Sequence, residues 1–258
     1  MLIGHMNSPF RPLAEEFAFA AGHGFDFLEL TVEPPSTPLE AVSAAEVERL
    51  SRLHNLPVPV GHGIWYLPYA HPVREIRAAC RAYWDKYLSL CLELGIAAAN
   101  IHVDFSCPQR LREQVFDHHF EFLSTLARKG RGVGVKIMLE PSGEGGEAAE
   151  MVERLLEGIP ELYLHLDLGH AHMAYNDGGI SFIRRHWRRL VHVHVSDNNG
   201  REDQHLPIGC GTVNFPRILN QLKRTGYDGT FTLEIFVSDR QYLLLGQEKL
   251  RRLWEEAV

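Results

Sequence analysis

The chain lacks long hydrophobic runs, a cleavable leader and disordered composition, and each absence excludes a class of protein. No run approaches the roughly 18 consecutive apolar residues that a membrane-spanning helix needs. The N-terminus has no basic stretch followed by an apolar block, which is the pattern of a secretory signal peptide. The hydrophobic fraction of 45% and the charged fraction of 23% are those of an ordinary globular protein. We therefore expect a cytoplasmic protein with no membrane partner.

Cysteine and basic residues are also scarce. The four cysteines, Cys80, Cys91, Cys107 and Cys210, have no paired spacing, so we expect reduced thiols and no disulfide framework. Lys and Arg number 26 against 33 Asp and Glu, which gives a net charge of −7 and argues against a protein built mainly to bind nucleic acid. Histidine is abundant instead, with fifteen residues that need an explanation.

Short apolar runs alternate with longer segments of helical periodicity along the whole chain. The runs are rich in Val, Ile and Leu, as are strands that are buried on both faces. Among the helical segments, 72–94 has the clearest spacing of three and four, from Val73 through Cys91 to Leu94. The runs cover residues 2–6, 25–30, 57–62, 97–103, 133–140, 162–167, 190–195 and 229–235.

Eight strand–helix units of about 30 residues each are typical of parallel α/β architecture. A closed (β/α)8 TIM barrel has a typical size of about 250 residues, close to the 258 residues present. A doubly wound open sheet is the alternative, but no Gly-rich phosphate-binding turn follows the first run. Because no linker or shift in composition interrupts the chain, we predict one TIM-barrel domain over residues 1–258.

Potential metal ligands stand where six of the predicted strands end. In a TIM barrel the loops that follow the carboxyl ends of the strands build the active face. Histidine or a carboxylate closes each run from the third to the eighth, and three more such residues follow closely in loops. We expect nine side chains to converge there: His62, His102, Glu140, Asp167, His170, His194, Asp203, His205 and Glu234.

Such a convergence of carboxylates predicts bound cations. Several buried carboxylates without cations would repel one another and would have to protonate. Divalent ions neutralise carboxylates and also bind neutral imidazole. Because the set contains no thiolate, it suits a transition metal better than calcium. We predict a divalent transition-metal cofactor, with zinc and manganese as the leading candidates and one, two or three ions per chain.

Three further residues are predicted to lie beneath the ligands. Side chains alternate along a strand, so His165 and His192 fall one layer below the strand ends. We expect them to be buried rings that hydrogen-bond a neighbouring carboxylate rather than ligands. Glu29 closes the second run, and it is either a partner that orients His62 or a plain inward-facing polar residue.

The segment HVHVSDNNGREDQHLPIGCGTVNF at 192–215 resembles the xylose-isomerase-like TIM-barrel superfamily, as do LEP at 139–141, DLGH at 167–170 and LEI at 233–235. This superfamily includes sugar and sugar-phosphate isomerases and epimerases, and the endonuclease IV phosphodiesterases. In the epimerase branch, the resemblance implies that the two glutamates exchange the substrate proton beside a single metal ion. That ion would be held by Glu140, Asp167, His194 and Glu234.

In the endonuclease IV branch, the resemblance implies a cluster of three ions. Glu140 would bridge an ion bound by His62 and His102 to an ion bound by Asp167, His194 and Glu234, and the third ion would take His170, Asp203 and His205. Departures from both patterns leave the choice open. The arginine that epimerases carry six residues after the seventh-strand histidine is Gly200 here, with Arg201 next to it, and the Pro-Gly pair that follows the fourth-strand histidine in endonuclease IV is absent.

Two reactions fit the predicted site. The first is isomerisation or epimerisation of a small polyol or sugar phosphate, with Glu140 and Glu234 as catalytic groups and a metal ion that polarises the carbonyl. Substrate contacts are then expected from Trp65 and His170, and from Asp197 and Arg201 in the loop after the seventh strand.

The second reaction is metal-assisted hydrolysis of phosphodiesters in abasic DNA. Its expected basic surface is missing, because the densest basic run, residues 184–189, lies on the helix that enters the seventh strand, at the barrel end opposite the active face. Nucleic acid is thus a disfavoured partner, and a non-catalytic metal sensor is disfavoured by the intact ligand set. Barrel enzymes often associate through their helices, so a homo-oligomer stays open, but nothing in the sequence locates an interface.

Overall fold

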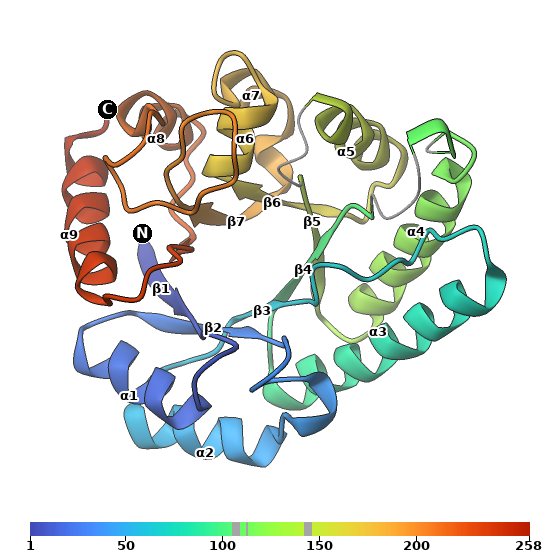
Figure 1. Ribbon diagram of the computed structural model, residues 1–258, viewed down its shortest axis with the longest axis horizontal. Helices are drawn as coiled ribbons and strands as arrows, with labels where there is room; N and C mark the ends of the chain where they lie inside the picture. Colours follow the sequence, from blue (N-terminus) through green and yellow to red (C-terminus); the bar gives the residue numbers. More distant parts are fainter. Residues whose placement is uncertain (105–108, 112, 142–145) are drawn as a thin grey trace.

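The computed structural model describes residues 1–104, 109–111, 113–141 and 146–258. Eight parallel strands pair in sequence order, and the pairing of β1 with β8 closes the sheet into a barrel. Helices surround the strands on the outside (Figure 1). The (β/α)8 fold that the alternating pattern predicts is confirmed.

The strands and helices follow the predicted order closely. The strands are β1 (Leu2–Met6), β2 (Phe27–Thr31), β3 (Val60–His62), β4 (Ala98–His102), β5 (Lys136–Glu140), β6 (Tyr163–Asp167), β7 (Leu190–Val195) and β8 (Thr230–Leu233). The α-helices are α1 (Leu13–Gly22), α2 (Ala44–His54), α3 (Arg74–Leu94), α4 (Phe116–Gly132), α5 (Gly146–Gly158), α6 (Leu168–Ala174), α7 (Ile180–His186), α8 (Phe215–Arg224) and α9 (Gln241–Glu256). Short 3-10 turns occupy Leu39–Ala41, Gln109–Leu111 and Trp187–Arg189.

Strand β3 is half as long as the apolar run 57–62 predicts. Pro57 and Pro59 lie in the first part of that run. Proline has no amide hydrogen and cannot donate to a strand ladder. Their carbonyls still accept: that of Pro57 from the backbone N–H of Leu28, and that of Pro59 from those of Ala97 and Ala98. The strand therefore begins at Val60.

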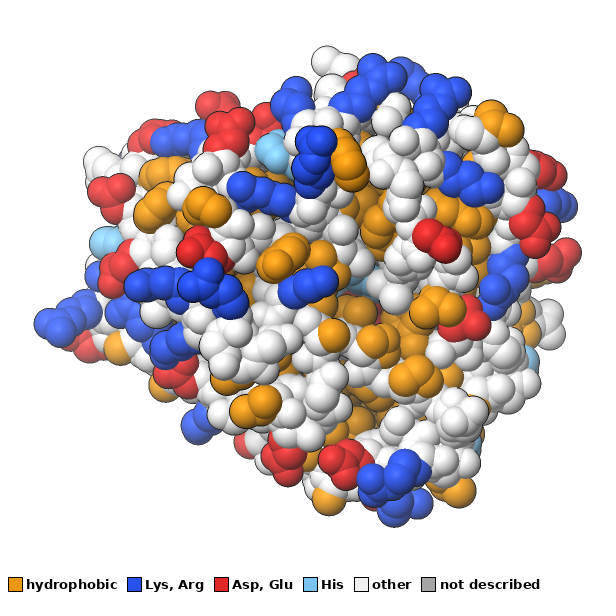
Figure 2. All heavy atoms as spheres, turned by 180° about the vertical axis from the view of Figure 1, so that it is seen from behind, with side chains coloured by type: hydrophobic (Ala, Val, Ile, Leu, Met, Phe, Trp, Pro, Cys, Tyr) orange, Lys and Arg blue, Asp and Glu red, His pale blue; other side chains and the backbone are white. Residues whose placement is uncertain are grey.

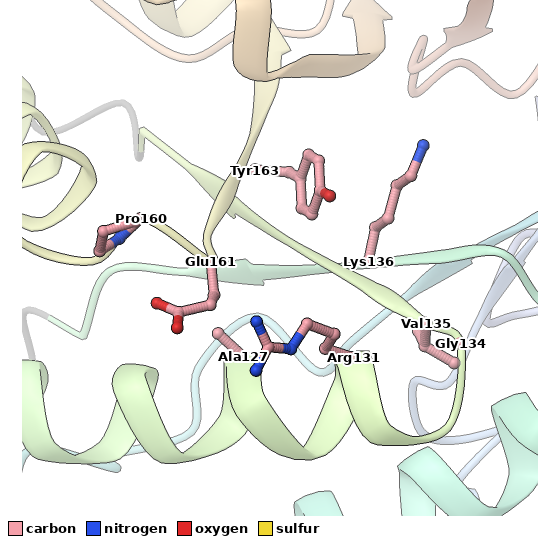
Figure 3. Close-up of a pocket in the computed structure, with 8 residues that line it drawn as sticks. All are labelled: Ala127, Arg131, Gly134, Val135, Lys136, Pro160, Glu161 and Tyr163. Carbon is pink, nitrogen blue, oxygen red and sulfur yellow. The ribbon is translucent and has the colours of Figure 1, made fainter.

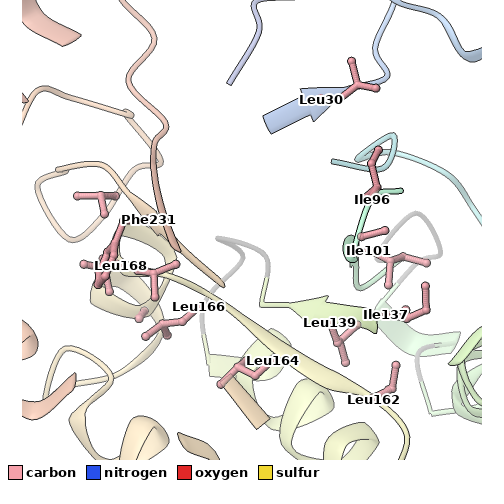
Figure 4. Close-up of a cluster of buried hydrophobic side chains, with 14 of the residues drawn as sticks. Leu30, Ile96, Ile101, Ile137, Leu139, Leu162, Leu164, Leu166, Leu168 and Phe231 are labelled. Atoms are coloured by element: carbon pink, nitrogen blue, oxygen red, sulfur yellow. The ribbon is translucent and has the colours of Figure 1, made fainter. Parts of the chain in front are cut away.

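Outward-facing side chains of the strands form the main core with the helices. Ile137 and Leu139 of β5 and Leu164 and Leu166 of β6 are buried in this layer (Figure 4). Side chains of neighbouring strand positions face the opposite way, into the barrel. There the lower part is filled by a small apolar group of Phe27, Val60, Ala98 and Met138.

Above this apolar floor the interior of the barrel is polar. Each of these strands carries a polar residue two positions after its apolar residue: Glu29 follows Phe27, His62 follows Val60, Asn100 follows Ala98 and Glu140 follows Met138. All four polar side chains are buried. Because alternate residues of a strand share a face, the sequence of each strand sets an apolar layer below and a polar layer above.

Helix α3 differs in detail from its prediction. It ends as predicted, with Gly95 in the left-handed conformation at φ 68°. At its start, however, Val73 is the N-cap and is 46% exposed, so its predicted place on the buried face is wrong. Val73 precedes the first helical turn, and its direction is therefore not set by the helical period. The largest buried side chain of the helix is Trp84, which is 1% exposed.

Two further findings concern cysteine and membranes. Cys80, Cys91 and Cys210 are free, and Cys107 lies outside the described residues. In the part of the chain that the structure describes, none of the helices is both long and apolar enough to cross a membrane.

Replacement of Trp84 by alanine tests the packing of α3 on the barrel. We expect Trp84→Ala to lower the free energy of unfolding by about 3–5 kcal/mol, because it leaves a cavity at a fully buried position. Chemical denaturation measures the change. Leu92→Ala on the same helix, where Leu92 is 56% exposed, is the matched control and should cost less than about 0.5 kcal/mol. Equal losses in the two variants would contradict the packing described.

Candidate active site

Six strands bring ligand-type side chains to one end of the barrel. Strands β3 to β6 end on such a residue, β7 carries one at its penultimate position, and one follows β8 directly. The strand register places His102 level with Glu140, and Asp167 level with His194. One ligand atom from each of Glu140, Asp167, His194 and Glu234 lies within 4.8 Å of the others, and all four residues are buried.

Glu140 occupies the centre of this arrangement. Its Oε2 lies 3.1 Å from Nε2 of His102 and 3.1 Å from Nδ1 of His165, and it accepts a hydrogen bond of 2.5 Å from the Asn100 amide. Its Oε1 lies 3.4 Å from Nδ1 of His170. Burial alone would raise the pKa of Glu140, but His102 and His165 hold that pKa well below its usual range. The carboxylate is therefore ionised at neutral pH.

Asp167 and Glu234 lie beside Glu140, and their pKa values are shifted in opposite directions. Burial raises the pKa of Asp167 to about 6. One of its oxygens accepts from the backbone N–H of His170 at 2.6 Å and caps α6, and the other is buried without a hydrogen-bond partner. Burial would likewise raise the pKa of Glu234, but His194, 3.0 Å from its Oε2, lowers it to about 2.

Among the described residues, four further groups of three could also hold an ion, and two of these contain the remaining predicted ligands. His62, His102 and Glu140 form one, and His170, Asp203 and His205 form the other. In the second group, Oδ2 of Asp203 lies 3.0 Å from Nε2 of His170 and 3.1 Å from Nε2 of His205. Nδ1 of His205 donates to the carbonyl of Glu234, which turns Nε2 toward Asp203. The structure thus brings all nine predicted ligands into three contiguous groups.

In the layer beneath the ligands, histidines hydrogen-bond a buried carboxylate. Glu29 is fully buried and lies 3.0 Å from Nε2 of His194 and 3.0 Å from Nε2 of His192. Its hydrogen-bond partners are therefore these two histidines and not His62, which was one of the two alternatives that the sequence left open. The ring of His62 instead stacks on that of His194, with centroids 5.6 Å apart. His192 is buried and hydrogen-bonded to Glu29, as expected. His165 is buried beside Glu140, but neither of its ring nitrogens makes a hydrogen bond within the described chain.

A cavity of about 820 Å³ opens above the ligand groups. Its lining includes His62, His102, His170, Asp203, His205 and Glu234 from those groups, together with Trp65. Asp197 and Arg201, the other two predicted substrate contacts, are not among the described residues that line it. Arg201 is exposed at the surface.

Asp197 has a different role, because its carboxylate binds the backbone of its own loop. It is buried and accepts hydrogen bonds from the N–H groups of Gly209, Gly211 and Val213, at 2.8 to 3.0 Å, and from Asn198. A Cβ at Gly211 would lie 2.3 Å from the carbonyl of Asn198, so this position needs glycine. Asp197 therefore fixes the β7–α8 loop, which carries Asp203 and His205.

Sequence reasoning missed several residues of the site. Asn100 joins β3 to β5, because its amide donates to Glu140 and its oxygen accepts from the N–H of Gly63. Glu33, two residues after β2, lines the cavity and accepts from the N–H of Trp65. Burial raises the pKa of Glu33. The signal for both was a polar residue inside or just after an otherwise apolar run.

A second cavity of about 370 Å³ lies away from these ligands. Lys136 and Tyr163, which line it, are the first residues of β5 and β6, so this cavity is at the amino ends of the strands (Figure 3). None of the possible metal-ligand groups in the described part of the chain includes its residues. In TIM barrels, that end serves stability rather than catalysis.

The chain matches a family model described as xylose isomerase-like TIM barrel over residues 17–257. The uncharacterized protein MJ1311 of Methanocaldococcus jannaschii is 34% identical over 128 residues, which are 47% of this chain and 44% of that protein. The matched segments cover about half or less of the length of the most similar curated relatives.

Solved structures match along nearly the whole chain. A D-tagatose 3-epimerase-like protein has a TM-score of 0.85 at 24% identity, with 99% of this chain and 98% of that chain covered. A structure of the IOLI protein with a zinc atom has a TM-score of 0.74 at 18% identity, with 99% and 96% covered. Sugar epimerases are also among the curated relatives and solved structures that match over at least 90% of this chain.

Proton release on metal binding tests the electrostatics of the site. Burial would lower the histidine pKa values, but carboxylates raise those of His170 and His194 well above the usual range and that of His205 to about 9. In metal-free protein at pH 7 these rings are protonated, and each must lose its proton to bind a metal. We expect Zn²⁺ or Mn²⁺ to displace protons at pH 7 and to bind more tightly as the pH rises toward 9.

Titration calorimetry in buffers of different ionisation enthalpy measures the protons released. His205→Gln should lower their number, whereas His54→Gln on the surface helix α2 should not. A binding enthalpy that is the same in every buffer would show that the rings are already neutral.

Proposed function

Because the chain belongs to the xylose isomerase-like TIM-barrel family, we propose that it is a divalent-metal-dependent enzyme that isomerises or epimerises a sugar or sugar phosphate. The observation that carries the proposal is the buried group of three carboxylates and one imidazole at the carboxyl ends of the strands. Active sites of TIM-barrel enzymes lie at this end.

The donor set fits a divalent transition metal. Glu140, Asp167, His194 and Glu234 offer three carboxylate oxygens and one imidazole nitrogen within 4.8 Å of one another. Oε1 of Glu140 and Oδ2 of Asp167 are buried without a hydrogen-bond partner in the described chain, which is costly unless something else satisfies them. Oxygen and imidazole ligands without a thiolate suit zinc or manganese. Such an ion, when bound, polarises a substrate carbonyl as a Lewis acid.

Glu140 and Glu234 are the proposed proton carriers. They come from β5 and from the residue after β8, so they reach the site from different sides. Neighbouring histidines hold both pKa values below the usual range, and each is therefore a carboxylate that can accept a proton. We propose that one glutamate, as a carboxylate, removes the proton from the carbon beside the carbonyl. The other first takes up a proton from water and then gives it to that carbon, so that the first glutamate ends protonated and the second ionised.

Substrate contacts are proposed from the cavity wall. Trp65 presents its ring at the opening and would pack on the apolar face of a sugar ring, while His170 would hydrogen-bond a hydroxyl group. We do not extend this role to Asp197, whose oxygens are already occupied by four backbone N–H groups.

Metal-assisted phosphodiester hydrolysis is a second candidate, because two more groups of three ligands adjoin the first. Clustered ions would generate hydroxide and bind both the attacking and the leaving oxygen. The basic residues give this candidate little support. Arg185 pairs with Glu153, and Arg189 donates to the carbonyls of Leu156 and Ile159 at the end of α5. On the face shown in Figure 2, basic and acidic side chains are interspersed around the periphery.

Glu140→Gln tests the central ligand. We expect bound metal to fall by more than tenfold and carbon-bound proton exchange to fall with it, because Glu140 belongs to two of the ligand groups. Elemental analysis and proton NMR in D₂O measure the two quantities. Glu121→Gln is the matched control, since Glu121 pairs with Arg81 on the surface. Full metal content and full exchange in Glu140→Gln would rule out the proposed centre.

A paired assay separates the two candidate functions. Metal-replete protein is offered ketoses and their phosphates in D₂O, and separately a duplex with one abasic site. We expect exchange of the carbon-bound proton in at least one sugar and no nicking of the duplex. Salt-sensitive nicking without any sugar exchange would favour the phosphodiesterase instead.

A further inference from the structure

Exposed aromatic side chains gather at the opening of the large cavity. Among the described residues that line it, Phe10 is 78% exposed, Trp65 63%, Tyr66 54% and Phe236 63%. We call these four residues the mouth aromatics. They come from the β1–α1, β3–α3 and β8–α9 loops, so separate parts of the sequence supply one rim. A gathering of apolar side chains exposed to water marks a binding surface.

The apolar lining continues from the mouth aromatics down into the cavity. Met6, Pro9, Ile235, Val237 and Leu243 also line it. The ring of Phe236 stacks on that of His205, with centroids 4.2 Å apart. Since His205 belongs to a ligand group, the apolar rim and the proposed reaction centre share one continuous wall. A ligand at the centre would therefore extend over the mouth aromatics.

Apart from the histidines of the ligand groups, the cavity offers few positive charges to a phosphate group. Only Arg11 and Arg240 carry a guanidinium or ammonium group among the described residues of the lining, and Arg11 is exposed. Nη2 of Arg240 lies 3.0 Å from Oε2 of the buried Glu16, and its guanidinium stacks on the ring of Phe19 at 3.4 Å. The charge of Arg240 is thus already neutralised.

The contact of Arg240 with His5 also disfavours binding of a phosphate group. Nη2 of Arg240 also lies 3.0 Å from Nε2 of His5, which in turn lies 2.6 Å from Oε2 of Glu16. Oε1 of Glu16 and Nδ1 of His5 are buried without a hydrogen-bond partner in the described chain. Because Glu16 is buried and already binds both Arg240 and His5, this cluster leaves no free positive charge for a phosphate. These groups therefore suit an uncharged polyol.

The volume of about 820 Å³ is near the upper end of the roughly 300–1,000 Å³ typical of ligand sites. A single sugar ring leaves much of such a cavity unfilled. Filling it requires a substituent on the sugar, and the mouth aromatics favour one that is flat and apolar, because aromatic rings stack on one another.

We propose that the substrate is an uncharged glycoside whose sugar lies at Glu140 and Glu234 and whose flat apolar aglycone stacks on the mouth aromatics. The proposal rests on the proposed proton transfer. A glycosidic bond blocks the anomeric carbon, so the carbonyl that activates the neighbouring C–H bond must be a ring ketone. One glutamate takes the proton from the carbon beside that ketone, and the other, after it has taken up a proton from water, gives it to the opposite face of that carbon. The C–H bond is thus restored with inverted configuration. The class of reaction that must supply this substrate is oxidation of a ring hydroxyl group in a glycoside.

Matched keto-glycosides test the proposal with metal-replete protein. Methyl and phenyl glycosides of the same ring-ketone sugar, and the 6-phosphate of the methyl compound, are compared by proton exchange in D₂O. Binding of the corresponding methyl and phenyl glucosides, which lack the ketone and do not react, is measured by calorimetry. We expect the phenyl compounds to bind about tenfold more tightly than the methyl compounds, and the phosphate to react more slowly than its uncharged parent.

Substitutions of the mouth aromatics test whether the phenyl group binds there. Trp65→Ala and Phe236→Ala should reduce the phenyl-to-methyl ratio of affinities toward one. Leu53→Ala is the matched control, because Leu53 is 65% exposed on α2 and does not line the cavity, and it should leave the ratio unchanged. A ratio near one in the unmodified protein, or a preference for the phosphate, would overturn the proposal.

Two other outcomes separate this proposal from its alternatives. If analytical ultracentrifugation shows a dimer that Trp65→Ala and Phe236→Ala dissociate, the mouth aromatics are an interface between copies and the aglycone site is rejected. If no compound exchanges its proton but the phenyl preference persists and both rim variants abolish it, the proposed reaction fails while the aglycone site stands.

Discussion

Repulsion between buried carboxylates is the constraint on which the upper half of this barrel depends. Glu29, Glu140, Asp167 and Glu234 are all buried within the same few layers of the barrel. Taken out of water, such groups can stay ionised only beside compensating positive charge. Imidazoles supply part of that compensation, since each glutamate of the set lies about 3 Å from at least one histidine ring. The abundance of histidine in this chain thus has an electrostatic cause.

At the centre of the carboxylate cluster the histidines do not fully compensate the negative charge. We expect the reaction to take place there. The pKa of Asp167 is raised to about 6 by burial, whereas histidines lower those of Glu140 and Glu234. Carboxylates in one cluster are therefore pushed in opposite directions by their surroundings, and this is common where a site is built to bind cations or move protons. The same neighbours that keep the glutamates ionised also fix their positions, as the proposed proton transfer requires.

Much of this arrangement could be predicted because period-two alternation ties sequence to geometry in a strand. Once Val60 and Met138 are assigned to the interior, His62 and Glu140 must share that interior one layer higher. The fold and the convergence of strand ends follow from this reasoning. Contacts across the barrel do not, because they depend on how far each strand is shifted against its neighbours. For this reason the sequence offered only His62, on the adjacent strand, as a partner for Glu29, whereas its partners lie on β7.

Loops limited the prediction further. From the sequence, Asp197 was predicted to contact the substrate because it is a carboxylate in a loop near the active end. In the structure its side chain turns inward and accepts hydrogen bonds from four backbone N–H groups. That single anchor has an evolutionary consequence. Asp203 and His205 belong to one loop that Asp197 holds together, and this loop contacts the barrel through the carbonyl of Glu234 and through His170. Both residues can therefore be gained or lost together by exchange of one segment. The number of ions that such a protein holds can then change while every strand stays as it is.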